Sequence, residues 1–233
     1  MARVFPSAVI ENLRPLIAGG RYPVKRIVED DLAVEADVFK DGHDVVAAAL
    51  KWRLVGEPRW HETAMSFVDN DRWRGICSLN EIGVYEYTVE AWTDTFRSWR
   101  DEFTKKFEAG ISDLTAETLE GAALIEAAGQ RAHVADDSAR LCELSECIRT
   151  ADHAQINNIV RSGELEVLMA TYPDRSWATQ YAPPPRVIVE RKEAQIAACM
   201  NFFHARPKVA ANADRNFVIV CPELTTRERW AST

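Results

Sequence analysis

The chain has 233 residues, of which 47% are hydrophobic and 27% are charged, an ordinary composition for a globular protein of one large or two small domains. Its formal net charge of −8 disfavours nucleic acid or an anionic membrane as a partner. No apolar run approaches the roughly 20 residues of a membrane helix, and the first residues lack the pattern of an export signal, so we expect a cytoplasmic protein.

The five cysteines are scattered along the chain and form no Cys-x-x-Cys pair. An odd number without metal-ligand spacing supports neither a disulfide framework nor a zinc site. We therefore expect reduced thiols, most of them in the core, at Cys77, Cys142, Cys147, Cys199 and Cys221.

The first 92 residues consist of short apolar runs separated by turn signals such as Gly19-Gly20 and Asp41-Gly42. After a leading run at 8–10, strands are predicted over residues 23–28, 32–39, 45–54, 60–67, 73–78 and 83–92. Short strands at intervals set by turns are typical of a β-sandwich.

The most regular alternation of apolar and polar residues runs from Gly83 to Trp92. It predicts a half-buried strand with an aromatic-rich inner face formed by Tyr85, Tyr87, Val89 and Ala91. Turn residues precede Trp73, and a short loop ends at Gly83. The segment from Trp73 to Ser78 is therefore predicted to be the hydrogen-bonded partner of this strand.

The period changes at Asp94, where apolar residues begin to recur every three or four positions. Asp94 is placed to cap a helix and Gly110 to end it. The aromatic stripe of this helix is predicted to pack against the sandwich or a partner subunit, and it consists of Phe96, Trp99, Phe103 and Phe107. Further helical patterns cover 115–128, 136–150 and 154–170, the last with a breaking signal at Ser162-Gly163. Together they predict a small antiparallel bundle.

A strand pattern returns at 186–190 after the helices end at Tyr172-Pro173-Asp174, and residues 217–220 have the pattern of one more strand. A strand on each side of the helical block indicates that the bundle is inserted into the β domain. The predicted fold class is α+β, an immunoglobulin-like antiparallel β-sandwich with an inserted helical bundle.

Several ordered stretches together resemble one family over roughly residues 8–203. They are IENLRP at 10–15, GGRYPVKR at 19–26, VEADVFKDGHD at 34–44, NDRW at 70–73, the strand at 83–92, WR at 99–100, LEGA at 119–122 and YPDR at 172–175. The chain resembles the N-terminal portion of the bacterial maltosyltransferases that use maltose-1-phosphate to extend α-1,4-glucan. The resemblance implies a β-sandwich and an inserted helical bundle that both contribute to a homodimer interface.

In that family, catalysis belongs to a following (β/α)₈ barrel of the α-amylase type, where an aspartate nucleophile and a glutamate acid/base run a retaining double displacement. A barrel of about 250 residues does not fit in the remaining chain. The family's first barrel strand has a Trp-Tyr-Glu core where this chain has Cys199-Met200-Asn201. We therefore expect a chain without the catalytic residues. The predicted division is 1–93 for the first part of the sandwich, 94–172 for the bundle, 173–203 for the return to the sandwich and the start of the barrel, and 204–233 for a divergent tail.

Acidic pairs are candidates for catalysis at Asp30-Asp31, at Asp69 with Asp71, and at Asp136-Asp137. A catalytic pair needs one raised pKa and a sugar cleft, whereas a chain with 36 acidic residues has many that cap turns or face solvent. We interpret all three pairs in the second way. The histidines show no ligand spacing, and no phosphate loop or nucleophile elbow is present, so no catalytic residue, metal site or cofactor is predicted.

Tryptophans are the better candidates for a binding site, because a flat apolar ring can stack on a sugar. Trp60 and Trp73 are the candidates for carbohydrate contact, and the alternative is that these rings fill the core. For Trp92 and Trp99 we expect packing.

The predicted function is that of a non-catalytic scaffold and dimerisation region of a maltosyltransferase that transfers maltosyl units from maltose-1-phosphate to glycogen-like α-1,4-glucan. A homodimer is the expected assembly and α-glucan a further expected ligand, whereas nucleic acid and membrane are not expected partners. Two alternatives stay open. One is a free-standing α-glucan-binding module that binds sugar as a monomer, and the other is a vestigial fragment without activity.

Overall fold

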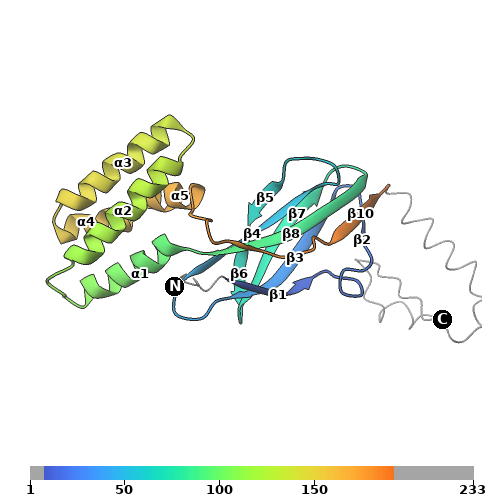
Figure 1. Cartoon of the computed structure of the whole chain (residues 1–233), viewed down its shortest axis with the longest axis horizontal. Helices are drawn as coiled ribbons and strands as arrows, with labels where there is room; N and C mark the ends of the chain where they lie inside the picture. The colour runs from blue at the N-terminus through green and yellow to red at the C-terminus, as the bar shows by residue number, and fades with distance from the viewer. Residues whose placement is uncertain (1–7, 192–233) are drawn as a thin grey trace, which may run out of the picture. The chain divides into compact units, whose positions relative to one another are not determined.

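The computed structural model describes residues 8–191 (Figure 1). Segments in which apolar residues alternate form strands, and segments in which they recur every three or four positions form helices. In that range ten strands flank five consecutive helices. The described residues up to Glu190 form one compact unit. The predicted fold class, a β-sandwich with an inserted helical bundle, is confirmed. The strand predicted at 217–220 lies outside the described residues.

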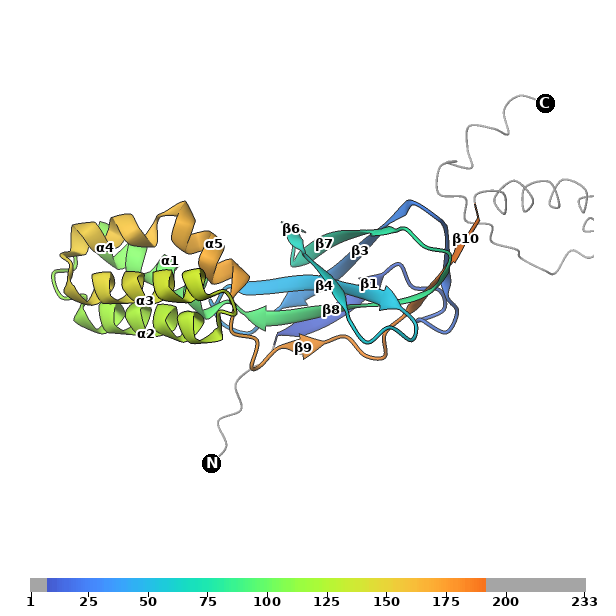
Figure 2. The same ribbon diagram turned by 90° about the horizontal axis from the view of Figure 1, so that it is seen from above.

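The strands form two sheets, which lie face to face (Figures 1 and 2). Their bounds are β1 Val9–Arg14, β2 Val24–Ile27, β3 Asp30–Phe39, β4 Val46–Leu54, β5 His61–Ala64, β6 Ser66–Asp69, β7 Arg72–Leu79, β8 Gly83–Thr93, β9 Thr179–Gln180 and β10 Arg186–Glu190. The smaller sheet has the order β1-β3-β7-β6, and the larger has the order β2-β10-β8-β4-β5, with β9 also pairing with β8. The described pairs are antiparallel except that β10 runs parallel to β2.

The core between the sheets is built from the residues that the alternation predicts. The buried set includes Leu32, Val34, Ala36 and Val38 on β3, with Tyr85, Tyr87, Val89 and Ala91 on β8. The hydroxyl of Tyr87 donates to the carbonyl of Pro15, and burial raises the pKa of Tyr87. On β7, a Cβ at Gly75 would lie 2.9 Å from the Cβ of Leu50 on β4. The glycine therefore allows the two sheets to approach closely at this point.

The predicted hairpin between residues 73–78 and 83–92 is wrong. β7 pairs with β3 and β6 in the smaller sheet, whereas β8 pairs with β4 over nine residues in the larger one. The connection of residues 80–82 therefore crosses from one sheet to the other. Alternation shows which face of a strand is buried, but both sheets of a sandwich offer a buried face, so it does not select the partner.

The single strand predicted at 60–67 is in fact two strands in different sheets. β5 pairs with β4, and β6 pairs with β7. Buried Met65 lies between them, and its backbone N–H donates to the carbonyl of Ala48 at 2.9 Å. Because the chain changes sheets at one apolar residue without Gly or Pro, the sequence carries no turn signal there.

The helices are α1 Thr95–Glu108, α2 Thr115–Arg131, α3 Ala135–Thr150, α4 His153–Val160 and α5 Gly163–Thr171. Asp94 caps α1 by accepting from the N–H of Arg97 at 2.9 Å, and Gly110 follows the helix with φ of 72°, both as predicted. The last predicted helix breaks at Ser162, whose hydroxyl accepts from the N–H of Leu165 at 3.3 Å and caps α5. Three residues connect α2 to α3, so the two helices lie side by side and antiparallel (Figure 2).

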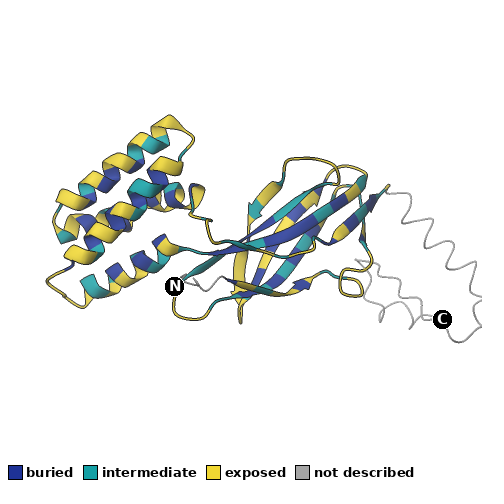
Figure 3. Ribbon diagram, in the orientation of Figure 1, coloured by how far each residue is buried: buried dark blue, intermediate teal, exposed yellow. Residues whose placement is uncertain are grey.

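The aromatic stripe of α1 packs inside the bundle. Phe96, Trp99 and Phe103 are buried in a core that the other four helices share, and Phe107 packs against it. Figure 3 shows buried segments, in dark blue, along the helices of the bundle. The indole N–H of Trp99 donates to the carbonyl of Glu117 on α2 at 2.7 Å. The prediction that this stripe packs against the sandwich or a partner subunit is therefore wrong, because the following helices cover it.

The described cysteines are free thiols in three different environments. Cys77 is buried in the sandwich core, as predicted, and this burial raises its pKa to about 12. Cys142 is exposed and Cys147 is half-buried on α3, so the expectation of mostly core thiols is wrong for these two. Cys199 and Cys221 lie outside the described residues.

Close packing of α1 on α2 depends on Gly121. A Cβ at this position would lie 1.9 Å from Cζ2 of Trp99, a distance that no repositioning of a methyl group can relieve. We expect Gly121→Ala to lower the free energy of unfolding by about 1–3 kcal/mol, because overpacking outweighs the better helix propensity of alanine. Urea unfolding followed by circular dichroism measures this change.

Gly163→Ala is the matched control for that experiment. Gly163 opens α5, and nothing lies within 4 Å of a Cβ built on it. The control is expected to leave stability unchanged or slightly higher. Equal stability of the two variants would contradict the packing role assigned to Gly121.

Candidate functional site on the larger sheet

The outward face of the larger sheet carries charged side chains in cross-strand register. The alternation that directs Val89 inward directs Glu86 and Glu90 outward on β8. Arg53 on β4 lies opposite Glu86, and its guanidinium binds that carboxylate at 2.6 Å. Lys51, two residues earlier, contacts Glu90 at 3.4 Å. The exposed fraction of these four side chains is 15–27%, so the ion pairs cover the sheet and are themselves partly shielded from solvent.

Arg175 completes this charged face from the segment that returns from the bundle. Its Nη1 and Nη2 donate to the two carboxylate oxygens of Glu62 on β5 at 2.8 and 2.6 Å. Nη1 also donates to Glu90 on β8 at 2.9 Å. The flat face of the guanidinium lies 4.0 Å from the ring of Trp92. One side chain thus connects two strands of the sheet and an aromatic ring, using the planar geometry that arginine offers and lysine does not.

The charges of this cluster respond to one another. The hydrogen bonds from Arg175 hold the pKa of Glu62 below its ordinary value, against a smaller opposing effect of burial. Burial has the largest single effect on the pKa of Arg175 and lowers it. The hydrogen bonds that Arg175 donates to Glu62 and Glu90, together with the negative charges of these carboxylates, outweigh burial, so the pKa of Arg175 is raised. Both groups are therefore charged across the physiological range.

Trp60, predicted to contact carbohydrate, lies at the margin of this charged face. It is half-buried and directly precedes β5, and its ring lies 4.3 Å from the guanidinium of Arg53. Arg53 in turn binds Glu86. An aromatic ring beside polar groups with fixed positions can offer a sugar both an apolar surface and hydrogen bonds.

Trp73, the second predicted contact, is 8% exposed and lies in the sandwich core, with Phe67 packed edge-on at 5.8 Å. This geometry favours the packing alternative for Trp73. Trp60 and Trp73 do not face one site, because Trp60 packs on Arg53 whereas Trp73 lies in the core between the sheets. Sugar contact itself stays a prediction. The packing predicted for Trp92 and Trp99 is confirmed, with exposed fractions of 7% and 4%.

A family model described as alpha-1,4-glucan:maltose-1-phosphate maltosyltransferase, domain N/S, matches residues 6–191. The chain belongs to this family.

Three similar proteins are named as maltosyltransferases of this type. The maltosyltransferase of Myxococcus xanthus is 42% identical over 205 residues, which cover 84% of this chain and 30% of the relative. That of Rhodospirillum rubrum is 37% identical over 204 residues, covering 82% and 30%. That of Streptomyces coelicolor is 30% identical over 200 residues, covering 82% and 29%. The chain thus spans about 30% of the length of these curated relatives.

The three acidic pairs of this domain N/S chain make structural contacts. Asp30 accepts from the N–H of Ile27 in the turn before β3 at 3.1 Å, and Asp31 accepts from the hydroxyl of Ser78 at 2.7 Å. Asp71 occupies a turn with φ of 62°, beside β6 and Asp69. Asp136 and Asp137 lie in the first turn of α3, where carboxylates favour the helix dipole.

Two further observations concern the described residues alone. None of them form a group of three or more His, Cys, Asp or Glu side chains arranged to hold a metal ion. No helix among them is long and apolar enough to cross a membrane.

Sequence reasoning did not single out Arg175 as a functional residue. The available signal was indirect, since Arg175 ends the YPDR stretch that carries part of the family resemblance. Its partners Glu62 and Glu90 are separated from it by 113 and 85 residues, and no local pattern connects them.

Replacing the arginine fork by a point charge tests the role of Arg175. Arg175→Lys keeps the charge but loses the paired hydrogen bonds, and we expect it to lower the free energy of unfolding by about 1–2 kcal/mol. The expected loss in free energy of unfolding is small because solvent screens part of the ion-pair interaction. Chemical denaturation measures it, with Arg186→Lys on the exposed side of β10 as the matched control. Identical losses in both variants would contradict the assigned role.

The lowered pKa of Glu62 predicts a pH-dependent difference between the wild type and Glu62→Gln. A carboxyl whose pKa is lower in the folded state stabilises that state above the unfolded pKa, about 4.3 for glutamate, and this stabilisation is lost as pH falls through the folded pKa. We expect the wild type to be the more stable protein at pH 7 and the difference to narrow steadily below about pH 4.

Urea titrations between neutral and acidic pH measure this difference. Glu120→Gln, at an exposed position of α2, is the control that should show no such narrowing. A stability difference that stays constant with pH would show that the charge of Glu62 plays no part.

Proposed function

We propose that this chain is a non-catalytic scaffold and dimerisation region of a maltosyltransferase that transfers maltosyl units from maltose-1-phosphate to α-1,4-glucan. The observation that carries the proposal is the domain N/S match, which covers the sandwich and the bundle together. Its relatives, named maltosyltransferases, are about three times longer, which leaves most of their length for catalysis. A cytoplasmic location stays a prediction.

Two aliphatic side chains of the bundle are exposed enough to be candidates for a dimer contact. Val167 on α5 and Leu119 on α2 are 65% and 56% exposed, large values for aliphatic side chains. The aromatic stripe of α1 is buried inside the bundle and is not available to a partner. These exposed aliphatic residues are therefore the side chains that we assign to the dimer contact.

Sedimentation velocity over a concentration series tests the dimer. We expect the wild type to dimerise without sugar, and the double variant Leu119→Glu with Val167→Glu to remain monomeric at the same concentration. Ile76→Glu, which introduces a charge at an exposed aliphatic position of β7 in the sandwich, is the control and should dimerise. A wild type that stays monomeric at high concentration would contradict the proposal. The same preparation is expected to release no phosphate from maltose-1-phosphate in the presence of a maltooligosaccharide.

The position of Trp60 favours α-glucan binding as a second candidate function. Its half-buried ring is positioned by Arg53, and Arg53 is positioned by Glu86, so the ring and its polar neighbours are arranged before any ligand binds. Such preorganisation lowers the entropic cost of binding.

Retardation of the native protein in glycogen-containing gels tests this second function. We expect Trp60→Ala to abolish the retardation, whereas Trp177→Ala, which removes a tryptophan that is 64% exposed, should preserve it. Wild-type mobility that is unaffected by glycogen would exclude the glucan-binding module.

A further inference from the structure

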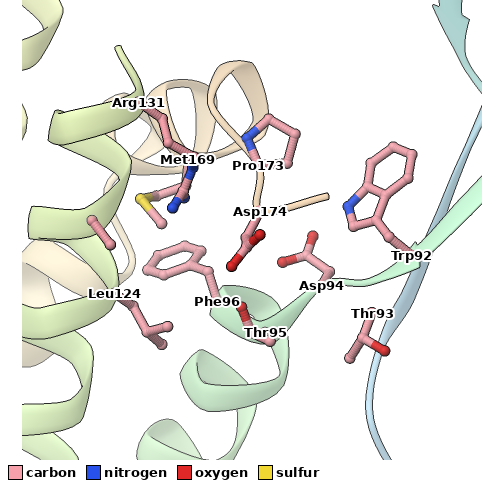
Figure 4. Close-up of a pocket in the computed structure, with 11 residues that line it drawn as sticks. Trp92, Thr93, Asp94, Thr95, Phe96, Leu124, Arg131, Met169, Pro173 and Asp174 are labelled. Atoms are coloured by element: carbon pink, nitrogen blue, oxygen red, sulfur yellow. The ribbon is translucent and has the colours of Figure 1, made fainter. Parts of the chain in front are cut away.

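A small cavity lies where β8 leads into the bundle and where the chain returns from it (Figure 4). Trp92 at the end of β8, Asp94 before α1, and Asp174 in the return segment contribute its polar side, and Phe96 and Met169 contribute apolar walls. We name it the joint cavity, and its volume is about 40 Å³.

The indole of Trp92 presents an unsatisfied donor to the joint cavity. Trp92 is 7% exposed, and its Nε1 has no hydrogen-bond partner among the described residues. Figure 4 shows this nitrogen turned toward the side where the carboxylates of Asp94 and Asp174 lie. Arg175 lies against the face of the ring and limits its rotation. An indole nitrogen can only donate, and leaving a buried donor unpaired destabilises the folded state.

The size of the joint cavity restricts what can occupy it. One water molecule needs roughly 10–15 Å³ of such space, whereas pockets for organic ligands measure about 300–1,000 Å³. At about 40 Å³, the joint cavity accommodates roughly two to four waters or a single ion, but no glucosyl unit.

The chemistry of the lining decides between these occupants. Two carboxylates disfavour an anion, although Arg131 also lines the cavity with its guanidinium donating to the carbonyl of Tyr172 at 3.2 and 3.0 Å. The N–H of Trp92 disfavours a cation, since its positive end faces the same space. A neutral molecule that both accepts and donates satisfies both constraints.

The carboxylates retain acceptor capacity beyond their protein contacts. Asp94 accepts from the backbone N–H of Arg97 through Oδ1, and the guanidinium of Arg97 lies 3.5 Å from its Oδ2. Asp174 accepts from the N–H and the hydroxyl of Ser176, in both cases through Oδ1, at 2.9 and 2.6 Å. Because an ionised carboxylate has about four lone-pair sites, each can accept a further bond.

We propose that the joint cavity is a binding site for one ordered water, which accepts from the N–H of Trp92 and donates to the carboxylates of Asp94 and Asp174. Asp94 marks the entry of the chain into the bundle and Asp174 its return. The water therefore connects the end of β8 to the segment that enters the bundle and to the segment that returns from it.

A crystal structure of the full chain at high resolution tests the location of the water. We expect density for one water at a normal hydrogen-bond distance from Nε1 of Trp92, with the two carboxylates as its other neighbours. A metal ion at this place, a direct protein acceptor for the N–H, or no ordered density would each overturn the proposal.

Site-specific replacement of Trp92 by benzothienylalanine tests the hydrogen bond in solution, because this isostere keeps the ring and has sulfur in place of the N–H. Losing a bridged donor should lower the unfolding temperature, whereas losing an unpaired donor should raise it or leave it unchanged. The same replacement at Trp73 is the control, since its Nε1 is also buried without a partner but Trp73 does not line the joint cavity. A lower unfolding temperature for the Trp92 replacement alone supports the proposal, and equal behaviour at the two positions overturns it.

Discussion

The guanidinium of Arg175 joins parts of the chain that are far apart in sequence. Its fork binds Glu62 on β5 and Glu90 on β8, and its flat face lies on Trp92, where β8 leads toward the bundle. Because the donors of an arginine have a fixed planar arrangement, these contacts are satisfied together only in a narrow range of orientations of the return segment. A half-buried ion pair adds little net stability once desolvation is counted, so we infer that its larger effect is on orientation.

Orientation matters because the sandwich and the bundle each have their own apolar core. Tyr87 and Val34 belong to the first core, and Phe103 and Ile125 belong to the second. Neither core needs the other to bury its largest side chains. The contacts where they meet include directional polar ones, such as the hydrogen bond from the N–H of Val45 to the hydroxyl of Ser98 at 2.8 Å. Directional bonds restrict geometry more than apolar contact does, and this suits a region whose proposed role is to position other parts of a protein.

Local pattern predicts the faces of these elements better than their partners. The inward residues of β3 and β8, and the cap at Asp94, follow from periods and turn chemistry that act within a few residues. The pairing of β7 with β3, and the change of sheet at Met65, depend on how two sheets share one core. The burial of Trp73 also depends on how the sheets pack. From sequence alone, an aromatic residue on a half-buried strand can equally lie in the core or form an exposed binding surface.

The charged face of the larger sheet could not be predicted from local sequence pattern, for a related reason. Trp60 is predicted as a candidate sugar contact because its neighbours in sequence are polar. Its ring, however, lies on Arg53, which belongs to the neighbouring strand β4. Such contacts depend on strand register, which the core and the turns set together. Two stretches that carry the family resemblance, LEGA at 119–122 and YPDR at 172–175, contain Gly121 beneath Trp99 and Arg175 between two carboxylates. Gly121 leaves room for the Trp99 ring, and Arg175 supplies the planar donors that both carboxylates accept from. The resemblance therefore carried information about long-range contacts that periodicity does not contain.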